Sequence, residues 1–208
     1  MSKAMLQPTL QRRPLVKKIL AGADANLLVI GGLGSSNWDI TDAGDRPLNM
    51  PLWGAMGAAV GMGLGLAMAQ PGKRVLVITG DGDMLMSVGS LATVATQQPE
   101  NLAIVVLDNE KFGETGNQAS HTSPRNNGPT ESGAGTDLSL IAKGCGIADT
   151  GTVRDQSEVA TLVKDLRTGK GPVFRLVKVM VEKLEFVMPP QDGAHLKDRF
   201  RAALLGSP

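Results

Sequence analysis

Four short apolar runs, each bounded by turn residues, constrain the fold of this 208-residue chain more than any other feature. The runs are Leu27–Ile30, Arg74–Thr79, Leu102–Leu107 and Val173–Val179. Gly, Asp or Asn follows each of the first three, and a Gly-Pro turn precedes the fourth. Such runs are typical of strands that are buried on both faces of a parallel sheet.

Helical patterns separate these runs. We expect helices at Leu15–Ala21, Gly54–Ala69, Met84–Thr96, Leu138–Gly144 and Ser157–Leu166, and again at Ala194–Leu205. Ser157 is the expected N-cap of its helix, because a serine hydroxyl accepts a hydrogen bond from a free backbone N–H. The alternation of strand and helix predicts a doubly wound α/β fold, in which a mostly parallel sheet carries helices on both faces.

The length of the chain suits one large domain and is short for two. We therefore predict a single domain over residues 1–208, with 182–208 as a C-terminal tail and helix. The segment Glu110–Thr136 has no clear period and is rich in Gly, Asn, Ser, Thr and Pro. A loop of that length inside a compact domain is usually functional or disordered.

Composition excludes several classes of protein. A net charge of +1 gives no basic footprint for nucleic acid. A single Cys cannot form an internal disulfide, a cysteine zinc site or an iron–sulfur cluster. No continuous apolar segment of a secretory signal follows the basic start of the chain, so we expect a cytoplasmic protein.

Residues 47–72 contain no charged side chain, and a segment of that length could cross a bilayer. The segment contains Asn49, Pro51, Gln70 and many glycines, however, whereas a lipid-facing helix is richer in Leu, Ile and Phe. We therefore predict a buried helix of small residues and no membrane span.

Polar residues follow two of the expected strands at the point where each strand ends. Gly80-Asp81-Gly82-Asp83 follows one strand, and Asp108-Asn109-Glu110 follows the next. Since neighbouring parallel strands end side by side, Asp81 and Asn109 can converge on one point, and an oxygen pair of this kind suits Mg²⁺ or Ca²⁺. The helix that follows would direct free backbone N–H groups at the same place, which favours a phosphate. A lone Gly-Asp-Gly can also be an ordinary turn, so the prediction depends on its pairing with the second motif at Asp108-Asn109.

Gly80-Asp81-Gly82, followed after 25 residues by Asp108-Asn109, resembles the fingerprint of thiamine-diphosphate-dependent enzymes. The stretch from Leu52 to Gly57 is similar to the segment that cradles the pyrimidine of the cofactor in that family. The resemblance covers roughly Leu27 to Val179, the diphosphate-binding (PP) domain. Within the family the chain most resembles the β subunits of sulfopyruvate decarboxylases and the matching half of phosphonopyruvate decarboxylases.

The resemblance implies a metal site and a cofactor site. For Mg²⁺ it implies the side chains of Asp81 and Asn109 and the carbonyl of Lys111. One departure is Asp108, which stands where the family usually has Asn. For thiamine diphosphate the implied residues are Ser35, Ser36, Gly54, Met56, Gly80, Gly82, Asp83 and Met84. Among them the carbonyl of Gly54 would accept from the aminopyrimidine, and Met56 would separate the two rings.

The resemblance also implies a partner. The family's catalytic Glu, which contacts the pyrimidine, belongs to a separate Pyr domain, for which a chain of 208 residues has no room. We therefore expect a Pyr-domain α subunit in a hetero-oligomer, with the cofactor at the subunit interface. The implied reaction is non-oxidative decarboxylation of a 2-oxo acid, a carboxy-lyase activity, on a substrate such as sulfopyruvate or phosphonopyruvate.

Two alternatives to the decarboxylase remain open at this stage. One is a carboligating subunit of the acetolactate synthase kind, and the other is a regulatory subunit that binds the cofactor without turnover. A ferredoxin-dependent oxidoreductase subunit is disfavoured, because one Cys cannot hold a cluster. Dinucleotide binding is also disfavoured, since Asn37 takes the place of the third glycine after Gly32 and Gly34.

Two further features allow a functional and an ordinary interpretation. His121 and Glu114 lie in the long loop and are candidates for proton transfer to the substrate, although an isolated loop His is more often a surface group. Gly57, Gly61 and Gly65 repeat every four residues and would form one smooth helix face. This face could contact a partner chain or pack on the sheet, and the pattern slightly favours the sheet.

Overall fold

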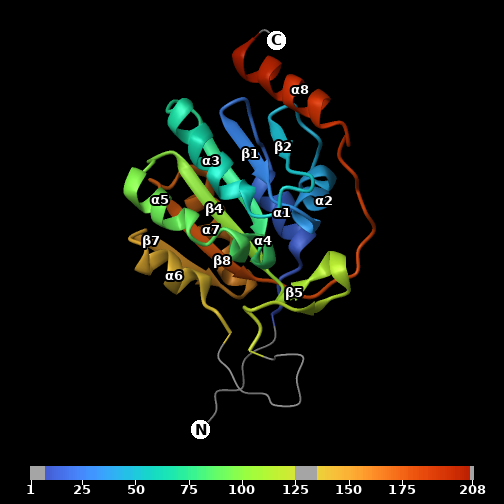
Figure 1. The fold of residues 1–208 in the computed structure, drawn as a ribbon, viewed down its shortest axis with the longest axis vertical. Helices are drawn as coiled ribbons and strands as arrows, with labels where there is room; N and C mark the ends of the chain where they lie inside the picture. The colour runs from blue at the N-terminus through green and yellow to red at the C-terminus, as the bar shows by residue number, and fades with distance from the viewer. Residues whose placement is uncertain (1–7, 125–134, 207–208) are drawn as a thin grey trace.

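The computed structural model describes residues 8–124 and 135–206. A central sheet lies between two layers of helices (Figure 1). All pairings in this sheet are parallel, so the doubly wound α/β fold expected from the sequence is confirmed. In order across the sheet, the six strands are β2 (Asn49–Pro51), β1 (Leu27–Gly31), β3 (Arg74–Gly80), β4 (Leu102–Asp108), β8 (Val173–Lys178) and β7 (Asp149–Val153).

Each face of the sheet has its own apolar core. One face is covered by α1 (Arg12–Leu20), α2 (Ser35–Asp42) and α7 (Val159–Thr168). The opposite face is covered by α3 (Ala58–Ala69), α4 (Asp81–Met86), α5 (Ser90–Gln97), α6 (Leu138–Gly144) and α8 (Gly193–Leu205).

Alternate residues of a strand enter opposite cores, because successive side chains of a strand point to opposite faces. In β3, Leu76 and Ile78 join the first core, whereas Val75 and Val77 join the second. All seven residues of β4 are buried, as expected of a strand covered on both sides. Burial on both faces explains why the central strands are continuous apolar runs in the sequence.

Two helices differ most from their expected bounds, whereas the ends of α1, α7 and α8 lie within three residues of the expected ones. The helix expected at Gly54–Ala69 begins only at Ala58, because Gly54 and Gly57 adopt left-handed φ values of 62° and 85° that end any regular helix. The helix expected at Met84–Thr96 is two helices, α4 and α5, separated by a turn at residues 87–89.

Other elements had no clear signal in the sequence. The short edge strand β2, the edge strand β7 and the helix α2 were not expected, since none is a long apolar run or a strong amphipathic pattern. The expected N-cap Ser157 was wrong: Asp155 caps the 3₁₀ turn η2 (Gln156–Glu158) that precedes α7. Asp155 forms a capping box with Glu158, and a carboxylate accepts from the free N–H groups as well as a serine does.

The glycine repeat on α3 does not face the sheet. Gly61 and Gly65 are exposed, and a Cβ at either position would meet no atom within 4 Å. Gly63 instead packs on the sheet, where its Cβ would lie 2.3 Å from Val77 Cγ2. The expectation of sheet packing for the repeat was therefore wrong, because the helix is rotated to place Gly63 inward.

The long loop holds a short hairpin made of β5 (Lys111–Phe112), the 3₁₀ turn η1 (Gly113–Thr115) and β6 (Gln118–Ala119). Residues 125–134 of that loop lie outside the described part of the chain. After β8 the chain runs without regular structure over residues 181–192, which we call the C-terminal strap, before it enters α8. Figure 1 shows the strap, in orange to red, passing along one side of the molecule from β5 to α8.

In the described ranges, no helix has both the length and the apolar character needed to cross a bilayer. The uncharged segment 47–72 forms β2, a turn and the twelve-residue helix α3. The expected helix of small residues is present, but it is buried on one side only, because Gly61, Met62, Gly65 and Met68 are exposed.

Candidate functional site

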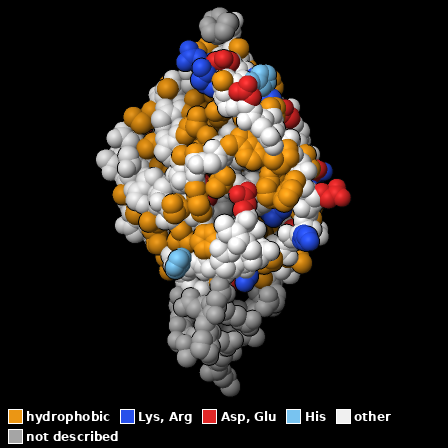
Figure 2. Space-filling model, turned by 45° about the vertical axis from the view of Figure 1, so that its right-hand side comes forward, with side chains coloured by type: hydrophobic (Ala, Val, Ile, Leu, Met, Phe, Trp, Pro, Cys, Tyr) orange, Lys and Arg blue, Asp and Glu red, His pale blue; other side chains and the backbone are white. Residues whose placement is uncertain are grey.

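The strand order reverses between β1 and β3, because the chain leaves β1 for β2 on one side and later returns to form β3 on the other. In open α/β sheets, ligands bind at such a reversal, beyond the carboxyl ends of the strands. A pocket of about 1450 Å³ opens at this position, and the residues after β1, β3 and β4 line it. Figure 2 shows one face of the molecule, on which hydrophobic side chains occupy much of the middle.

Most of the residues expected from the sequence line this one pocket. They are Ser35, Met56, Gly80, Asp81, Gly82, Asp83, Asn109, Lys111 and Glu114. Four others do not line it. Ser36 and Met84 are buried inside the fold, at 2% and 0% exposure, while Gly54 and His121 are exposed outside the pocket. The structure therefore brings Glu114 to the pocket but leaves His121 at the surface beyond β6.

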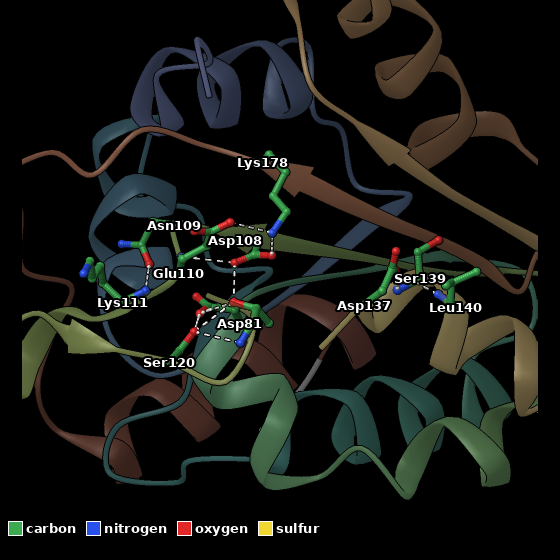
Figure 3. A network of polar contacts seen from close by, with 11 residues as sticks. Asp81, Asp108, Asn109, Glu110, Lys111, Ser120, Asp137, Ser139, Leu140 and Lys178 are labelled. Atoms are coloured by element: carbon green, nitrogen blue, oxygen red, sulfur yellow. Dashed lines mark hydrogen bonds and ion pairs between the residues drawn. The ribbon is translucent and has the colours of Figure 1, made fainter. Parts of the chain in front are cut away.

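Asp81 is the first residue of α4 and lies buried at the carboxyl end of β3. Its Oδ2 accepts a hydrogen bond from the hydroxyl of Ser120 (Figure 3) and lies 3.1 Å from the hydroxyl oxygen of Thr122. Burial, and then the negative charge of Asp108, raise the pKa of Asp81 to about 6, although the neighbouring hydroxyls of Ser120 and Thr122 oppose the shift. Because burial and Asp108 destabilise the charged form of Asp81, a bound cation would stabilise that form.

Asp108, the departure from the family pattern, is fully buried and ion-paired. Lys178 Nζ lies 2.6 Å from Asp108 Oδ2 and 3.0 Å from Glu110 Oε1. Burial alone would lower the pKa of Lys178, but the charges and hydrogen bonds of Asp108 and Glu110 outweigh it and raise the pKa. Thr122 connects the two aspartates, since its hydroxyl donates to Asp108 Oδ1 at 2.7 Å and its oxygen lies 3.1 Å from Asp81 Oδ2.

The turn after β4 presents Asn109 and Lys111 at the pocket. Asn109 Oδ1 accepts the backbone N–H of Lys111 at 3.0 Å, and Glu110 between them has a left-handed φ of 62°. An amide oxygen has two lone pairs, so Asn109 Oδ1 retains one for a cation. This turn brings the amide oxygen and the Lys111 backbone to the same part of the pocket.

The oxygen atoms of Asp81, Asn109 and Lys111 fit Mg²⁺, which takes few protein ligands and completes its octahedron with phosphate oxygens and water. No side chain in the described residues hydrogen-bonds Asp81 Oδ1, so that oxygen is available to a cation. The described part of the chain has no group of three or more His, Cys, Asp or Glu that could hold a metal.

Gly82 allows close approach at the start of α4. A Cβ at this position would lie 2.6 Å from a ring carbon of Phe112 and 3.5 Å from Met56 Cε. The backbone N–H groups of Gly82 and Asp83 belong to the first turn of the helix, where they have no intrahelical acceptor. This part of the pocket can therefore receive an oxyanion close to the backbone.

The side chain of Asp83 joins two parts of the pocket. Its Oδ1 accepts the backbone N–H of Gly57 at 2.6 Å, and its Oδ2 accepts the hydroxyl of Thr79. Asp83 thereby holds the segment that contains Met56 against α4, and Met56 faces the pocket at 37% exposure. The resemblance implies contact of Asp83 with the cofactor, and the structure adds this side-chain role.

The opposite wall of the pocket comes from residues that the sequence did not suggest as part of a site. Trp38 of α2 contacts Phe186 of the C-terminal strap, with ring centroids 4.2 Å apart. Arg12 anchors this wall: its Nε lies 2.5 Å from Asp39, and its backbone N–H donates to Glu182 at 3.0 Å. Burial raises the pKa of Asp39, although Arg12 and Arg13 oppose the shift.

Of the pocket and network residues that the sequence analysis missed, only some carried a signal in the sequence. Lys178 carried such a signal, because a lysine inside an apolar strand requires a buried partner for its charge. Trp38 and Phe186 are 148 positions apart, and nothing in their local sequence links them.

The chain is similar in sequence to known proteins. The family model described as "Thiamine pyrophosphate enzyme, C-terminal TPP binding domain" matches residues 33–177. The sulfopyruvate decarboxylase subunit beta of Methanocaldococcus jannaschii is 37% identical over 71% of this chain and 72% of its own length. That of Methanothermobacter thermautotrophicus is 31% identical over 95% of this chain and 97% of its own.

Longer proteins match through only part of their length. The phosphonopyruvate decarboxylase of Streptomyces viridochromogenes is 28% identical over 99% of this chain, which spans 49% of that protein. Among solved structures, benzoylformate decarboxylase from Polynucleobacter necessarius superposes with a TM-score of 0.63 at 20% identity, covering 85% of this chain and 34% of that one. The structural similarity shows the fold alone. The family model and the sequence identity show that this chain belongs to the thiamine pyrophosphate enzymes and carries their C-terminal TPP-binding domain.

Proposed function

We propose that the chain is the PP-domain subunit of a thiamine-diphosphate- and Mg²⁺-dependent decarboxylase of 2-oxo acids. The observation that carries the proposal is the similarity, at 31% identity over 95% of the chain and 97% of the relative, to a sulfopyruvate decarboxylase subunit beta. The pocket at the strand reversal supports it, since nine of the thirteen site residues expected from the sequence line that pocket.

In this proposal Asp81 and Asn109 hold Mg²⁺ through side-chain oxygens, and Lys111 adds its backbone carbonyl. The N–H groups of Gly82 and Asp83 bind the diphosphate, whose negative charge suits the free donors of a first helical turn. When bound, thiamine diphosphate supplies an electron sink for the pair of electrons released as CO₂ departs.

Other pocket residues have proposed roles around the cofactor. Ser35 lines the pocket beside Gly34 and offers a hydroxyl to the diphosphate. Met56, held in place through the Asp83–Gly57 hydrogen bond, would support the bent shape of the cofactor with a soft, unbranched side chain. Glu114 is the proposed proton-transfer residue of this chain, because its carboxylate lines the pocket and has no hydrogen-bond partner in the described ranges.

A substrate with a second anionic group, such as sulfopyruvate or phosphonopyruvate, would meet two lysines in a pocket that also contains five carboxylates, those of Asp81, Asp83, Glu114, Glu182 and Glu185. Lys111 and Lys183 line it, and neither side chain has an ion-pair partner in the part of the chain that the structure describes. The other pocket cation, Arg12, is already paired with Asp39. The two lysines are therefore available to a sulfonate or phosphonate, whereas a monoanionic 2-oxo acid would need only one of them.

The second subunit in this proposal is a Pyr-domain chain that supplies the Glu against the pyrimidine. The names of the relatives as beta subunits support a hetero-oligomer. An exposed face of small and apolar residues supports it as well. This α3 face consists of Ala58, Gly61, Met62, Gly65, Met68 and Ala69, all exposed on one side of the helix.

The test is co-expression of the chain with a partner of Pyr-domain size that carries the expected Glu. With thiamine diphosphate and Mg²⁺, the purified complex should release CO₂ from sulfopyruvate or phosphonopyruvate faster than from pyruvate. Asp81→Ala in the same complex should abolish Mg²⁺-dependent cofactor binding, measured by calorimetry.

Two results would contradict the proposal. If the complex binds the cofactor but releases no CO₂ from any 2-oxo acid, the decarboxylase is excluded. CO₂ release from pyruvate with acetolactate as the product, in place of an aldehyde, would instead identify a carboligase. Unchanged Mg²⁺-dependent affinity in Asp81→Ala would remove Asp81 as a metal ligand.

A further inference from the structure

We propose that Lys178 and Asp108 form one positioning pair that holds both proposed Mg²⁺ ligands, Asp81 and Asn109, in place. The inference rests on the proposed function, since it concerns the same metal site. It assigns a purpose to the aspartate that departs from the family pattern, and it assigns one to Lys178, which lies outside that pattern.

The pair is built into the sheet. Asp108 is the last residue of β4 and Lys178 the last residue of β8, and the two are directly opposite each other in the parallel register. Both are buried, at 0% and 8% exposure, and their charged atoms are 2.6 Å apart. The backbone closes the same position, since Val179 N donates to the Asp108 carbonyl at 3.0 Å. Neither side chain can move far without disrupting the end of the sheet.

One oxygen of Asp108 reaches toward both proposed ligands. Its Oδ1 accepts the backbone N–H of Glu110 at 3.0 Å, which fixes the turn that presents Asn109. The same Oδ1 accepts the Thr122 hydroxyl at 2.7 Å, and Thr122 lies 3.1 Å from Asp81 Oδ2. Figure 3 shows Lys178 directed at Asp108 and Glu110, with Asp81 and Ser120 nearby.

Lys178 determines which side chain is compatible with position 108, because its ammonium requires an acceptor there. With Lys178 present, Asp108 Oδ2 is a charged acceptor for the ammonium. An asparagine whose Oδ1 kept the Glu110 and Thr122 hydrogen bonds would turn its Nδ2 donors toward the ammonium, so donors would face donors. If Lys178 were replaced alone, Asp108 would keep a buried charge that only neutral donors offset. The aspartate and the lysine are thus required together, and a neutral pair could replace both.

The test measures Mg²⁺ affinity in a mutant cycle on the complex with its partner chain. The variants are D108N, K178M and the double variant D108N/K178M, titrated with Mg²⁺ in the presence of thiamine diphosphate by calorimetry. Each single variant should weaken Mg²⁺ binding by about tenfold or more, the effect expected when a hydrogen bond to a charged group is lost. The double variant should recover most of that loss, because its neutral groups no longer conflict.

A matched control separates positioning from general stability. Arg175 is another buried cation of β8, and it pairs with Asp149 at 2.7 Å and Asp165 at 2.8 Å away from the pocket. R175M should lower the melting temperature but leave Mg²⁺ affinity unchanged at temperatures where the protein is folded. A second route uses Thr122: T122V should weaken Mg²⁺ binding, and T122S, which keeps the hydroxyl, should restore it.

Three outcomes would overturn the inference. The first is a double variant that binds Mg²⁺ no better than D108N, and the second is T122V with wild-type affinity. The third is R175M with the same loss of affinity as K178M. If the single variants do not fold, the two Thr122 variants decide the question. If the wild-type complex itself shows no Mg²⁺-dependent cofactor binding, the proposed function fails first, and the inference fails with it.

Discussion

Gly82 lies so close to Phe112 that no side chain fits at its position. A Cβ on Gly82 would lie 2.6 Å from the Phe112 ring, shorter than any real carbon contact, and Met56 closes the other side. At the scale of single residues, this glycine thus permits two elements of the pocket to meet, α4 and the hairpin that begins at β5.

Gly82→Ala should therefore displace the Phe112 ring. Overpacking of this kind typically costs about 1–3 kcal/mol in the free energy of unfolding, and the movement should also weaken cofactor binding. Urea unfolding and a thiamine diphosphate titration measure the two effects.

The matched control is Gly89→Ala. Gly89 is exposed, has a helical φ of −61°, and a Cβ there would meet no atom within 4 Å. This variant should stay within about 0.5 kcal/mol of the wild type. Equal urea midpoints for Gly82→Ala and the wild type would show that the ring can move at no cost.

At the scale of elements, the C-terminal strap is the part that local sequence patterns describe least. It has no regular structure, yet residues 181–186 line the pocket. Its attachment is tertiary: Arg12 N donates to Glu182, Arg13 donates to the Glu185 carbonyl at 2.8 Å, and Phe186 contacts Trp38. The strap therefore forms one wall of the site that α1 and α2 hold in place.

Phe186→Ala should loosen this wall. Loss of an aromatic pair costs about 0.5–1.5 kcal/mol beyond area burial, and Trp38 should become more hydrated. In a Trp53→Phe background, which leaves Trp38 as the only tryptophan, the emission should shift to longer wavelengths, and KM for the 2-oxo acid should rise.

Met188→Ala is the control for the strap, because Met188 is 44% exposed and does not line the pocket. It should change neither the emission nor KM. An unchanged emission maximum in Phe186→Ala would mean that the strap does not cover Trp38 in solution.

At the scale of the whole molecule, the exposed α3 face gives the clearest indication of assembly. A Cβ at Gly61 or Gly65 would meet no atom of the described chain within 4 Å, and Met62 and Met68 are 38% and 55% exposed. A smooth apolar face of this kind, beside a pocket to which Met56 contributes, suits the proposed partner subunit.

Met62→Glu combined with Met68→Glu should prevent assembly, because burying two carboxylates at an interface is costly. The affinity for the partner chain should fall by about tenfold or more, as for interface hot spots. Light scattering after size exclusion measures assembly, and far-UV circular dichroism shows that the fold is retained.

Ala160→Glu is the control for this surface. Ala160 is exposed on α7, on the opposite face of the sheet from α3, and the substitution also adds a carboxylate. It should leave the complex intact. If the double Met variant assembled as well as Ala160→Glu, the partner would bind elsewhere.

The sequence by itself determined the elements whose signal is local. Continuous apolar runs identified the four central strands, because burial on both faces requires them. Polar residues at the ends of those runs located Asp81 and Asn109, since parallel strands end side by side. The edge strands β2 and β7, the start of α3 and the break between α4 and α5 depend on turns and pairing, and these carried weak signals.

Only the tertiary structure decided which distant residues meet. Lys178 reaches Asp108 across 70 positions, Ser120 reaches Asp81 across 39, and Phe186 reaches Trp38 across 148. Such contacts arise from the order of strands in the sheet and the path of the strap, which no local pattern records. The sequence could therefore locate the candidate metal site, whereas the charges that hold it and the wall that closes its pocket follow from the folded chain.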